Sequence, residues 1–179
     1  DSYRQLLAGG NVFRIPRFQR DYSWKEEHWE DLWSDILDLM NDPESDAHYM
    51  GYLVLQPKPG SGLDIIDGQQ RMTTLSLIVL AGMRKIRELV HAGIDAQNNN
   101  TRLDELRRTY IGQLDTVSLT VNSKLTLNRN NDNYYQTYLA TLREMPSRGF
   151  KASEHLMRKA TDWFLRKLAE YITISGRPA

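Results

Sequence analysis

Residues 63–75, LDIIDGQQRMTTL, are the stretch that decides the fold. Their first half is apolar like a short strand, and their second half begins a helical pattern that continues to about Val90. Asp67 and Gly68 stand at the junction. A strand that runs directly into a helix brings free backbone N–H groups and the positive end of the helix dipole to the strand end. This stretch therefore predicts the central helix of the fold and, at its start, a site that suits an anion.

The flanking sequence predicts an α+β fold in which mixed elements come first and helices dominate after about residue 100. An apolar run at residues 49–55 and the strand at 63–66, with a turn between them, are typical of a hairpin. Ser23 and Glu26 form a capping-box pattern that predicts a helix start. Residues 96–101 are rich in asparagine and are expected to be a polar loop. The other expected elements are helices at residues 2–8, 23–41, 67–90, 102–113, 132–143 and 153–172 and strands at residues 12–15 and 124–127.

The composition limits what the chain can be. Its 179 residues are 40% hydrophobic and 26% charged, which is ordinary for a globular protein. It has no cysteine, which excludes disulfides, thiolate metal sites and thiol nucleophiles. The longest apolar stretch, residues 75–83, is far shorter than the roughly 20 residues of a membrane span, and the first residues lack the pattern of an export signal. We therefore expect a cytoplasmic protein without a membrane segment.

The charges balance overall but are segregated along the chain. There are 23 basic and 23 acidic residues, which argues against a protein that is basic all over. Residues 24–46 hold nine acidic residues and one lysine, whereas residues 143–167 hold seven basic residues and three acidic ones. The two segments are either solvated helix faces or, for the basic one, a surface for nucleic acid or an acidic partner.

A first chemistry-bearing motif, RIPRFQRDYSW, covers residues 14–24. It places Arg14, Arg17 and Arg20 at three-residue spacing among aromatic residues and a glutamine. Arginine forks suit phosphate, and aromatic rings stack on bases. The alternative is a rigid loop whose aromatic residues plug the core while its arginines are solvated.

The second motif is the Asp-Gly-Gln-Gln-Arg run at residues 67–71. Gly68 permits close backbone approach, and Asp67 could hold Mg²⁺ or orient a water molecule, because Mg²⁺ usually takes one or two carboxylates plus substrate phosphates. Alternatively, Asp67 and Gln70 are a capping box. Such a cap needs neither the second glutamine nor an arginine, which opposes the helix dipole in a first turn. Walker and Gly-x-Gly-x-x-Gly motifs are absent, and the four histidines lack metal-ligand spacing. Residues 128–135 lie between a predicted strand and a predicted helix, and they could form a third wall of the site beside these two motifs.

Three ordered motifs carry a family resemblance: IPxxQRxYxW at residues 15–24, YMGYLVL at residues 49–55 and IDGQQRMTTL at residues 66–75. Over roughly residues 1–140 the chain resembles the family catalogued as domain of unknown function 262, the N-terminal domain of GmrSD-type modification-dependent restriction enzymes. Phe18 stands where the family often has tyrosine, which removes a hydroxyl and keeps the stacking surface. The family's His-Asn-His nuclease signature is absent, so this chain is not expected to cut DNA by itself.

The resemblance implies a ParB/sulfiredoxin-like fold, in which a small mixed sheet packs on helices. Residues 1–100 would be the nucleotide-binding core, and residues 101–179 a mainly helical extension from a longer protein. Asp67, Gln69, Gln70 and Arg71 are the catalytic candidates, and Asp67 is also the candidate metal ligand. The candidate nucleotide contacts are Arg17, Gln19, Arg20, Tyr22, Gly51, Gly68, Thr73 and Thr74. The implied cofactor is Mg²⁺ with a nucleoside triphosphate.

Three functional hypotheses remain open from the sequence. The first is a nucleotide-binding, NTP-hydrolysing regulatory domain of a bacterial DNA restriction or anti-phage system, acting with a C-terminal nuclease domain or partner subunit. The second is a DNA-binding sensor of modified DNA without NTP turnover. The third is an interaction domain in which both motifs serve only the core.

Overall fold

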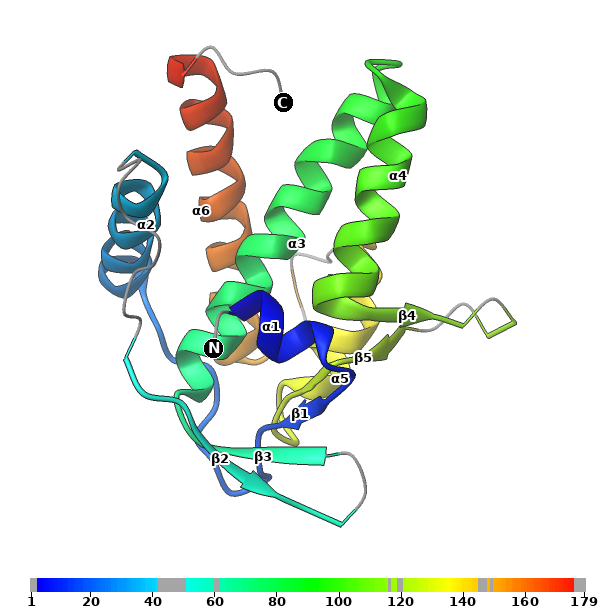
Figure 1. Cartoon of the computed structure of the whole chain (residues 1–179). Coiled ribbons are helices and arrows are strands. Elements are labelled where there is room, and N and C mark those ends of the chain that lie inside the picture. The colour runs from blue at the N-terminus through cyan, green and yellow to red at the C-terminus, as the bar shows by residue number, and fades with distance from the viewer. Residues whose placement is uncertain are drawn as a thin grey trace.

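The computed structural model describes residues 3–41, 51–59, 62–115, 117–118, 121–144, 148 and 150–175. Figure 1 shows a small sheet at one end of the molecule and long helices that extend away from it. The helices are α1 (Tyr3–Ala8), α2 (Glu26–Asn41), α3 (Gln69–His91), α4 (Ala96–Leu106), α5 (Asp132–Tyr134) and α6 (Ala152–Ser175), with π-helical turns η1 (Arg107–Ile111) and η2 (Tyr135–Leu139). The strands are β1 (Val12–Arg14), β2 (Val54–Pro57), β3 (Gly62–Asp67), β4 (Gly112–Leu114), β5 (Val121–Ser123) and β6 (Leu125–Thr126). The predicted α+β class is confirmed.

The main sheet is mixed and has the strand order β2-β3-β1-β6. β2 and β3 form the predicted antiparallel hairpin, but its first strand begins at Val54, residues 51–53 are not in a strand, and residues 49 and 50 lie outside the described residues. β1 lies parallel to both β3 and β6. Phe13 on β1 is opposite Leu63 on one side and Leu125 on the other, and it is fully buried. β6 belongs to the predicted helical extension and nevertheless completes this sheet. The boundary at residue 100 and the ParB/sulfiredoxin-like topology stay predictions.

The predicted central helix is confirmed as α3, which begins two residues after β3 ends. Figure 1 shows it between α4 and α6, and it packs against both. Its buried side combines apolar residues with hydroxyl-bearing ones, among them Met72, Leu77, Leu80 and Met83 and also Thr73, Thr74 and Ser76. No helix of the described residues is long and apolar enough to cross a membrane.

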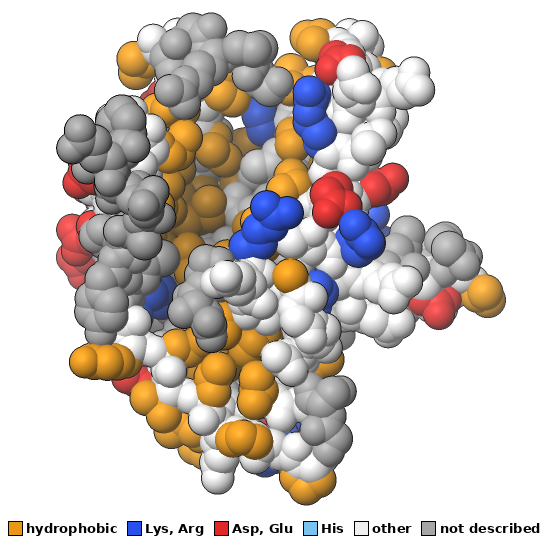
Figure 2. Space-filling model, viewed as in Figure 1, with side chains coloured by type: hydrophobic (Ala, Val, Ile, Leu, Met, Phe, Trp, Pro, Cys, Tyr) orange, Lys and Arg blue, Asp and Glu red, His pale blue; other side chains and the backbone are white. Residues whose placement is uncertain are grey.

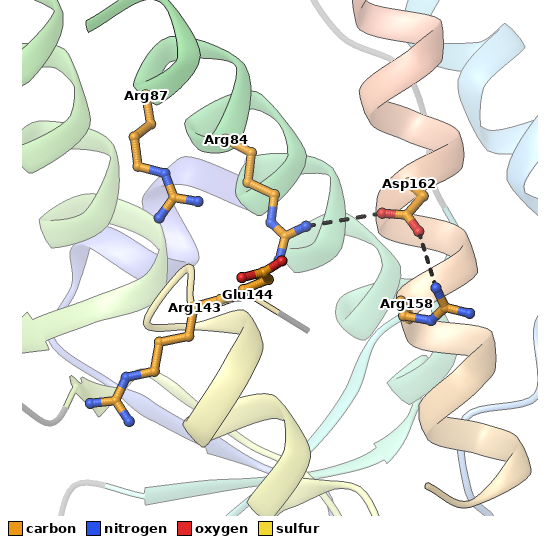
Figure 3. A pocket seen from close by; sticks show the side chains of 6 residues that line it. All are labelled: Arg84, Arg87, Arg143, Glu144, Arg158 and Asp162. Carbon is orange, nitrogen blue, oxygen red and sulfur yellow. Dashed lines mark hydrogen bonds and ion pairs between the residues drawn. The ribbon is translucent and has the colours of Figure 1, made fainter. Parts of the chain in front are cut away.

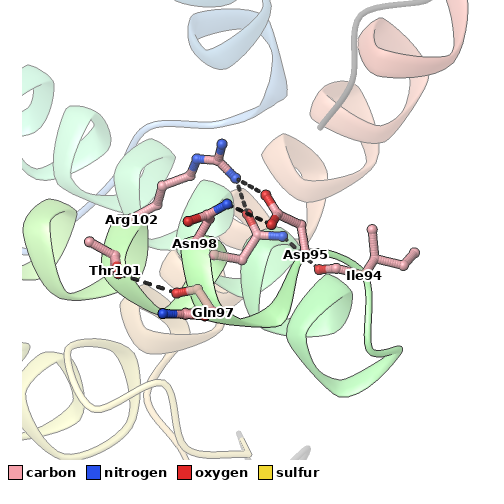
Figure 4. Close-up of polar contacts among 7 residues, drawn as sticks. Ile94, Asp95, Gln97, Asn98, Thr101 and Arg102 are labelled. Carbon is pink, nitrogen blue, oxygen red and sulfur yellow. Dashed lines mark hydrogen bonds and ion pairs between the residues drawn. The ribbon is translucent and has the colours of Figure 1, made fainter.

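The predicted loop at residues 96–101 is wrong, because these residues form the first half of α4. Figure 4 shows why asparagines are tolerated here. Asn99 is buried and donates from Nδ2 to the Ile94 carbonyl at 2.9 Å, while Arg102 donates to Asn99 Oδ1 at 2.6 Å and to Asp95 Oδ2 at 3.1 Å. Asn98 Nδ2 donates to Asp95 Oδ1 at 2.7 Å. These side chains hold the helix start in place of a packed apolar face.

A chain of buried hydrogen bonds links α2 to α3 through the loop between β1 and α2. Trp29 Nε1 donates to the Tyr22 hydroxyl at 3.0 Å, and Thr74 Oγ1 donates to the Gln70 carbonyl at 2.8 Å. The Tyr22 hydroxyl lies 2.9 Å from Thr74 Oγ1, so Tyr22 is the donor in that pair. Burial raises the pKa of Tyr22 well above its ordinary value, which keeps the hydroxyl protonated.

Replacing Tyr22 with phenylalanine is expected to destabilise the protein by about 1–3 kcal/mol, because the buried Trp29 N–H loses its acceptor. Urea unfolding measures the change. Tyr171→Phe is the control, since its hydroxyl has no hydrogen-bond partner among the described residues, and it should change stability by less than about 0.5 kcal/mol. Equal effects of the two substitutions would contradict the assignment.

Candidate functional site

The two motifs meet at the end of β3 through a pair of glutamines. Gln19 Nε2 donates to the Ile66 carbonyl at 3.1 Å, and Gln19 Oε1 accepts from Gln69 Nε2 at 3.2 Å. One side chain of the first motif therefore contacts both the strand and the helix of the second. The two motifs therefore lie side by side in the structure.

Gln70 binds the loop between β1 and α2 with both ends of its amide. Its Oε1 accepts from the Ser23 N–H at 2.9 Å, and its Nε2 donates to the Asp21 carbonyl at 3.1 Å. α2 begins at Glu26, so Ser23 lies outside the helix and the predicted capping box with Glu26 is wrong. The Ser23 N–H is already used by Gln70, and Glu26 Oε1 accepts from Trp163 Nε1 at 2.9 Å.

Residues 128–131 support the same loop from the other side. Asn128 Nδ2 donates to the Gln19 carbonyl at 3.0 Å and to Asp21 Oδ1 at 2.7 Å. Asn131 Oδ1 accepts from the Tyr22 N–H at 2.9 Å. The asparagine-rich segment after β6 thus contacts the loop that carries the first motif, and its role as a third wall of a ligand site stays a prediction.

The start of α3 has no side-chain cap. Gly68 is the N-cap residue with φ 92°, and Asp67 Oδ1 accepts from the Gly68 N–H at 2.8 Å. The alternative capping box of Asp67 and Gln70 is therefore wrong, because both side chains have other partners. Met72 makes the first backbone bond of the helix, to the Gly68 carbonyl at 3.0 Å. The backbone N–H groups of Gln69, Gln70 and Arg71 have no hydrogen-bond acceptor among the described residues.

Glycine is required at two positions beside this helix start. A Cβ on Gly68 would lie 2.8 Å from Leu53 Cδ1, and a Cβ on Gly51 would lie 3.0 Å from Arg71 Nη1. Both glycines have a left-handed φ, 92° and 85°. Arg71 Nη1 also approaches the Tyr52 carbonyl at 3.5 Å. The guanidinium of Arg71 thus lies against bare backbone on one side.

A pocket of about 340 Å³ lies next to Arg71. It is lined by Trp24, His28, Asp31, Leu32, Asp35, Gly51 and Arg71. The rings of Trp24 and His28 are stacked, with centroids 5.5 Å apart and planes at 18°. This volume is within the range of about 300–1,000 Å³ that is usual for small-molecule pockets.

A second cavity, behind the Asp-Gly-Gln-Gln-Arg motif, is much smaller than the pocket next to Arg71. It measures about 10 Å³ and is lined by Arg20, Tyr22, Gln69, Gln70 and Thr73 together with Ile15, Leu127, Asn128 and Asn131. That volume suits about one water molecule. Thr73 donates its hydroxyl to the Gln69 carbonyl at 2.8 Å, and Thr74 bonds Gln70 and Tyr22. In this conformation a nucleotide would have to lie on the outer face of the motif.

The candidate residues thus divide into two groups by exposure. Tyr22, Gln69, Gln70, Thr73 and Thr74 are buried, and each has hydrogen bonds inside the protein. Asp67, Gly51, Arg17 and Arg20 are exposed, and Gln19, Gly68 and Arg71 are partly exposed. Arg17 and Arg20 have no ion-pair partner among the described residues. All the assigned roles stay predictions.

The part of the chain that the structure describes contains no cluster of three or more His, Cys, Asp or Glu that could hold a metal by itself. Asp67 instead suits a Mg²⁺ ion that is held by a single carboxylate together with the phosphates of a substrate. It is an exposed carboxylate with Oδ1 on the Gly68 N–H, beside the uncapped start of α3. Mg²⁺ commonly binds through one or two carboxylates plus substrate phosphates, so a metal that arrives with a nucleotide suits this donor set.

Comparison with protein-family models gives a match that covers nearly the whole chain. The model of the GmrSD restriction endonuclease N-terminal domain matches residues 3–175. No curated protein matches the chain significantly. The match extends beyond the three motifs to the end of α6.

Substituting Gln70 with leucine should release the loop from α3 and destabilise the protein by about 1–3 kcal/mol, because the Ser23 N–H and the Asp21 carbonyl lose their partners. Hydrogen exchange of the Ser23 amide should accelerate in the same variant. Gln56→Leu on the exposed face of β2 is the matched control and should change neither property. Unchanged protection of Ser23 in the Gln70 variant would contradict the role assigned to this amide.

Proposed function

The chain belongs to the family of the GmrSD restriction endonuclease N-terminal domain, and we propose that this restriction module binds a nucleoside triphosphate with Mg²⁺ and hydrolyses it. The observation that carries the proposal is the uncapped start of α3, which follows Asp67 and carries Arg71, with Arg20 in the lining of the small cavity beside Gln69 and Gln70. Nucleotide turnover would regulate DNA cleavage by a C-terminal nuclease domain or partner subunit in the cytoplasm.

The phosphate chain is proposed to lie on the N-terminal turn of α3. The free N–H groups of this turn and the dipole of a 23-residue helix attract negative charge. Arg71 is placed by Gly51 and the Tyr52 carbonyl, so its position costs little entropy when a ligand arrives. Arg20 supplies a second cation from the opposite loop. Two cations and a helix start would stabilise the charge that develops during phosphoryl transfer.

Asp67 is the proposed ligand of the Mg²⁺ ion. When bound, the ion would neutralise phosphate charge and polarise the oxygens of the nucleotide. Asp67 is exposed, and its Oδ1 accepts from the Gly68 N–H, whereas its Oδ2 has no hydrogen-bond partner among the described residues. This bond places the carboxylate next to the N-cap residue of α3.

Gln69 is a better candidate than Gln70 to orient the attacking water. Both ends of the Gln70 amide already bind the loop, so its use in catalysis would require the loop to detach. Gln69 uses only its Nε2, toward Gln19, and its Oε1 has no hydrogen-bond partner among the described residues. A carbonyl oxygen next to a phosphate site can accept a hydrogen bond from water.

Exposed aromatic rings offer a surface for the base. Figure 2 shows apolar side chains gathered over the end of the molecule that holds β2 and β3. Tyr52 is 79% exposed and Phe18 is 82% exposed. Phe18 directly precedes Gln19, and the Tyr52 carbonyl accepts from Arg71, so the backbone of both residues is close to the proposed phosphate site. Base stacking on such rings is tolerant of base identity.

Calorimetric titration of ATP, GTP, CTP and UTP, with and without Mg²⁺, tests binding, and phosphate release tests hydrolysis. Arg71→Ala is expected to weaken binding about tenfold or more through the loss of a charged hydrogen bond. Asp67→Asn should abolish the contribution of Mg²⁺ and phosphate release. Arg4→Ala and Asp104→Asn, which change exposed charges on α1 and α4, are the controls and should behave like the native chain. Absence of any effect of nucleotide would reject the proposal.

The rival hypothesis is a DNA-binding module without turnover. It requires the exposed Arg17 and Arg20 to contact DNA phosphates, which makes DNA affinity fall steeply with salt concentration. A gel-shift series in rising salt distinguishes the two. DNA binding that depends on Arg17 and Arg20, together with indifference to nucleotide, would favour this rival.

A further inference from the structure

A second charged pocket lies far along α3 from the proposed nucleotide site. It has a volume of about 430 Å³ and is lined by Arg84, Arg87, Arg143, Glu144, Arg158 and Asp162. Figure 3 shows that these side chains come from three segments: α3, the chain after η2, and α6. Arg84 follows Arg71 by 13 residues on the same helix, which corresponds to about 20 Å along its axis. The two sites are therefore distinct.

Positive charge exceeds negative charge in this pocket, with four arginines against two carboxylates. Asp162 is shared between Arg84, at 4.0 Å, and Arg158, at 3.9 Å. Both distances exceed the 2.7–2.9 Å of a direct charge-assisted hydrogen bond. Glu144 lines the pocket but makes no ion pair among the described residues. The arginines are thus only partly neutralised by the protein itself.

Backbone carbonyls, which carry no net charge, hold two of the arginines in place. Arg87 donates to the Leu142 carbonyl at 2.5 Å, and Arg84 donates to the Arg143 carbonyl at 3.3 Å. Leu142 is buried and has a φ of 56°, a left-handed conformation that is costly for leucine. The chain after η2 is bent so that two adjacent carbonyls face α3. This arrangement fixes guanidinium groups without cancelling their charge.

Hydrogen bonds and ion pairs within the protein only partly compensate the burial of the guanidinium groups of Arg84 and Arg158. The Nε atoms of Arg84 and Arg158 are buried and have no hydrogen-bond partner in the part of the chain that the structure describes. Burial, opposed by Asp162 and reinforced by Arg87, lowers the pKa of Arg84 from its ordinary value. An anion in the pocket would supply the missing negative charge.

We propose that this pocket binds a phosphate group, carried either by a small phosphorylated molecule or by the backbone of a nucleic acid. Arginine forks approach the pocket from three segments of the chain. A tetrahedral phosphate offers oxygens in several directions, whereas a carboxylate offers two oxygens in one plane. The geometry therefore favours phosphate over the carboxylates of an acidic peptide. This site is independent of the nucleotide site proposed at the start of α3.

The test is calorimetric titration of the chain with inorganic pyrophosphate, a short single-stranded oligonucleotide and a short DNA duplex at low salt. Arg158→Gln should weaken binding about tenfold or more, because it removes a fork from the pocket. Arg166→Gln, an equal charge change on the exposed part of the same helix, is the matched control and should have little effect. Melting temperatures establish that each variant is folded.

A second pair of variants changes binding in the opposite direction. Asp162→Asn removes the carboxylate that the two arginines share and should strengthen pyrophosphate binding severalfold. Glu170→Gln also removes one negative charge from α6 but lies outside the pocket, so it should leave the affinity unchanged. A purely structural role for these residues would not produce tighter anion binding in the Asp162 variant.

The outcomes separate this pocket from the nucleotide site. The proposal is supported if pyrophosphate still binds to the Arg20→Ala/Arg71→Ala variant and no longer binds to the Arg158→Gln variant. This outcome does not depend on whether the chain hydrolyses nucleotides. Binding of pyrophosphate alone identifies a small phosphorylated ligand, whereas duplex or single-strand binding with the same variant profile identifies a nucleic-acid backbone. Equal affinity of the native chain and the Arg158 variant overturns the proposal. Equal losses in the Arg166 control, or tighter binding of a poly-glutamate peptide than of pyrophosphate, also overturn it.

Discussion

The amide of Gln70 is the interaction on which the arrangement of both the core and the proposed site depends. It satisfies one donor and one acceptor of the loop between β1 and α2, and so attaches that loop to the first turn of α3. With the loop in this position, Tyr22 reaches Thr74 and Trp29, and Gln19 reaches Gln69. A buried polar network of this kind is stable only when each member is satisfied. The same contacts therefore stabilise the protein and shape its exposed face.

The periodic parts of the fold could be predicted from the sequence. The strand-to-helix junction at residues 63–75, the hairpin and the final helix all have the spacing that their burial requires, and the structure confirms them. The start of α4 could not be predicted, because its stability comes from the side chains of Asp95, Asn99 and Arg102 rather than from an apolar stripe. The π-helical turns that end α4 and α5 likewise depend on packing rather than on a local pattern.

The sequence located the candidate site but could not divide its residues by role. Gln69 and Gln70 are identical in type and adjacent in sequence, and only their partners show that one binds the loop and the other has an amide oxygen without a partner among the described residues. The arginine pocket was harder still to foresee. The basic stretch at residues 143–167 gave a partial signal, but Arg84 and Arg87 come from a helix about sixty residues earlier, and only the fold brings them to Arg158. Long-range convergence of this kind leaves no local pattern.

The position of β1 has a consequence for how the protein is made. β1 is short and lies between two parallel neighbours, one of which, β6, is more than a hundred residues later in the chain. During synthesis, the Phe13 and Ile15 N–H groups remain unpaired until the carbonyls of Lys124 and Thr126 have left the ribosome. A nascent chain that ends before that point presents an open strand edge, which other chains can pair with. Folding of the sheet is therefore delayed until β6 has been translated, and the protein is exposed to aggregation in this interval.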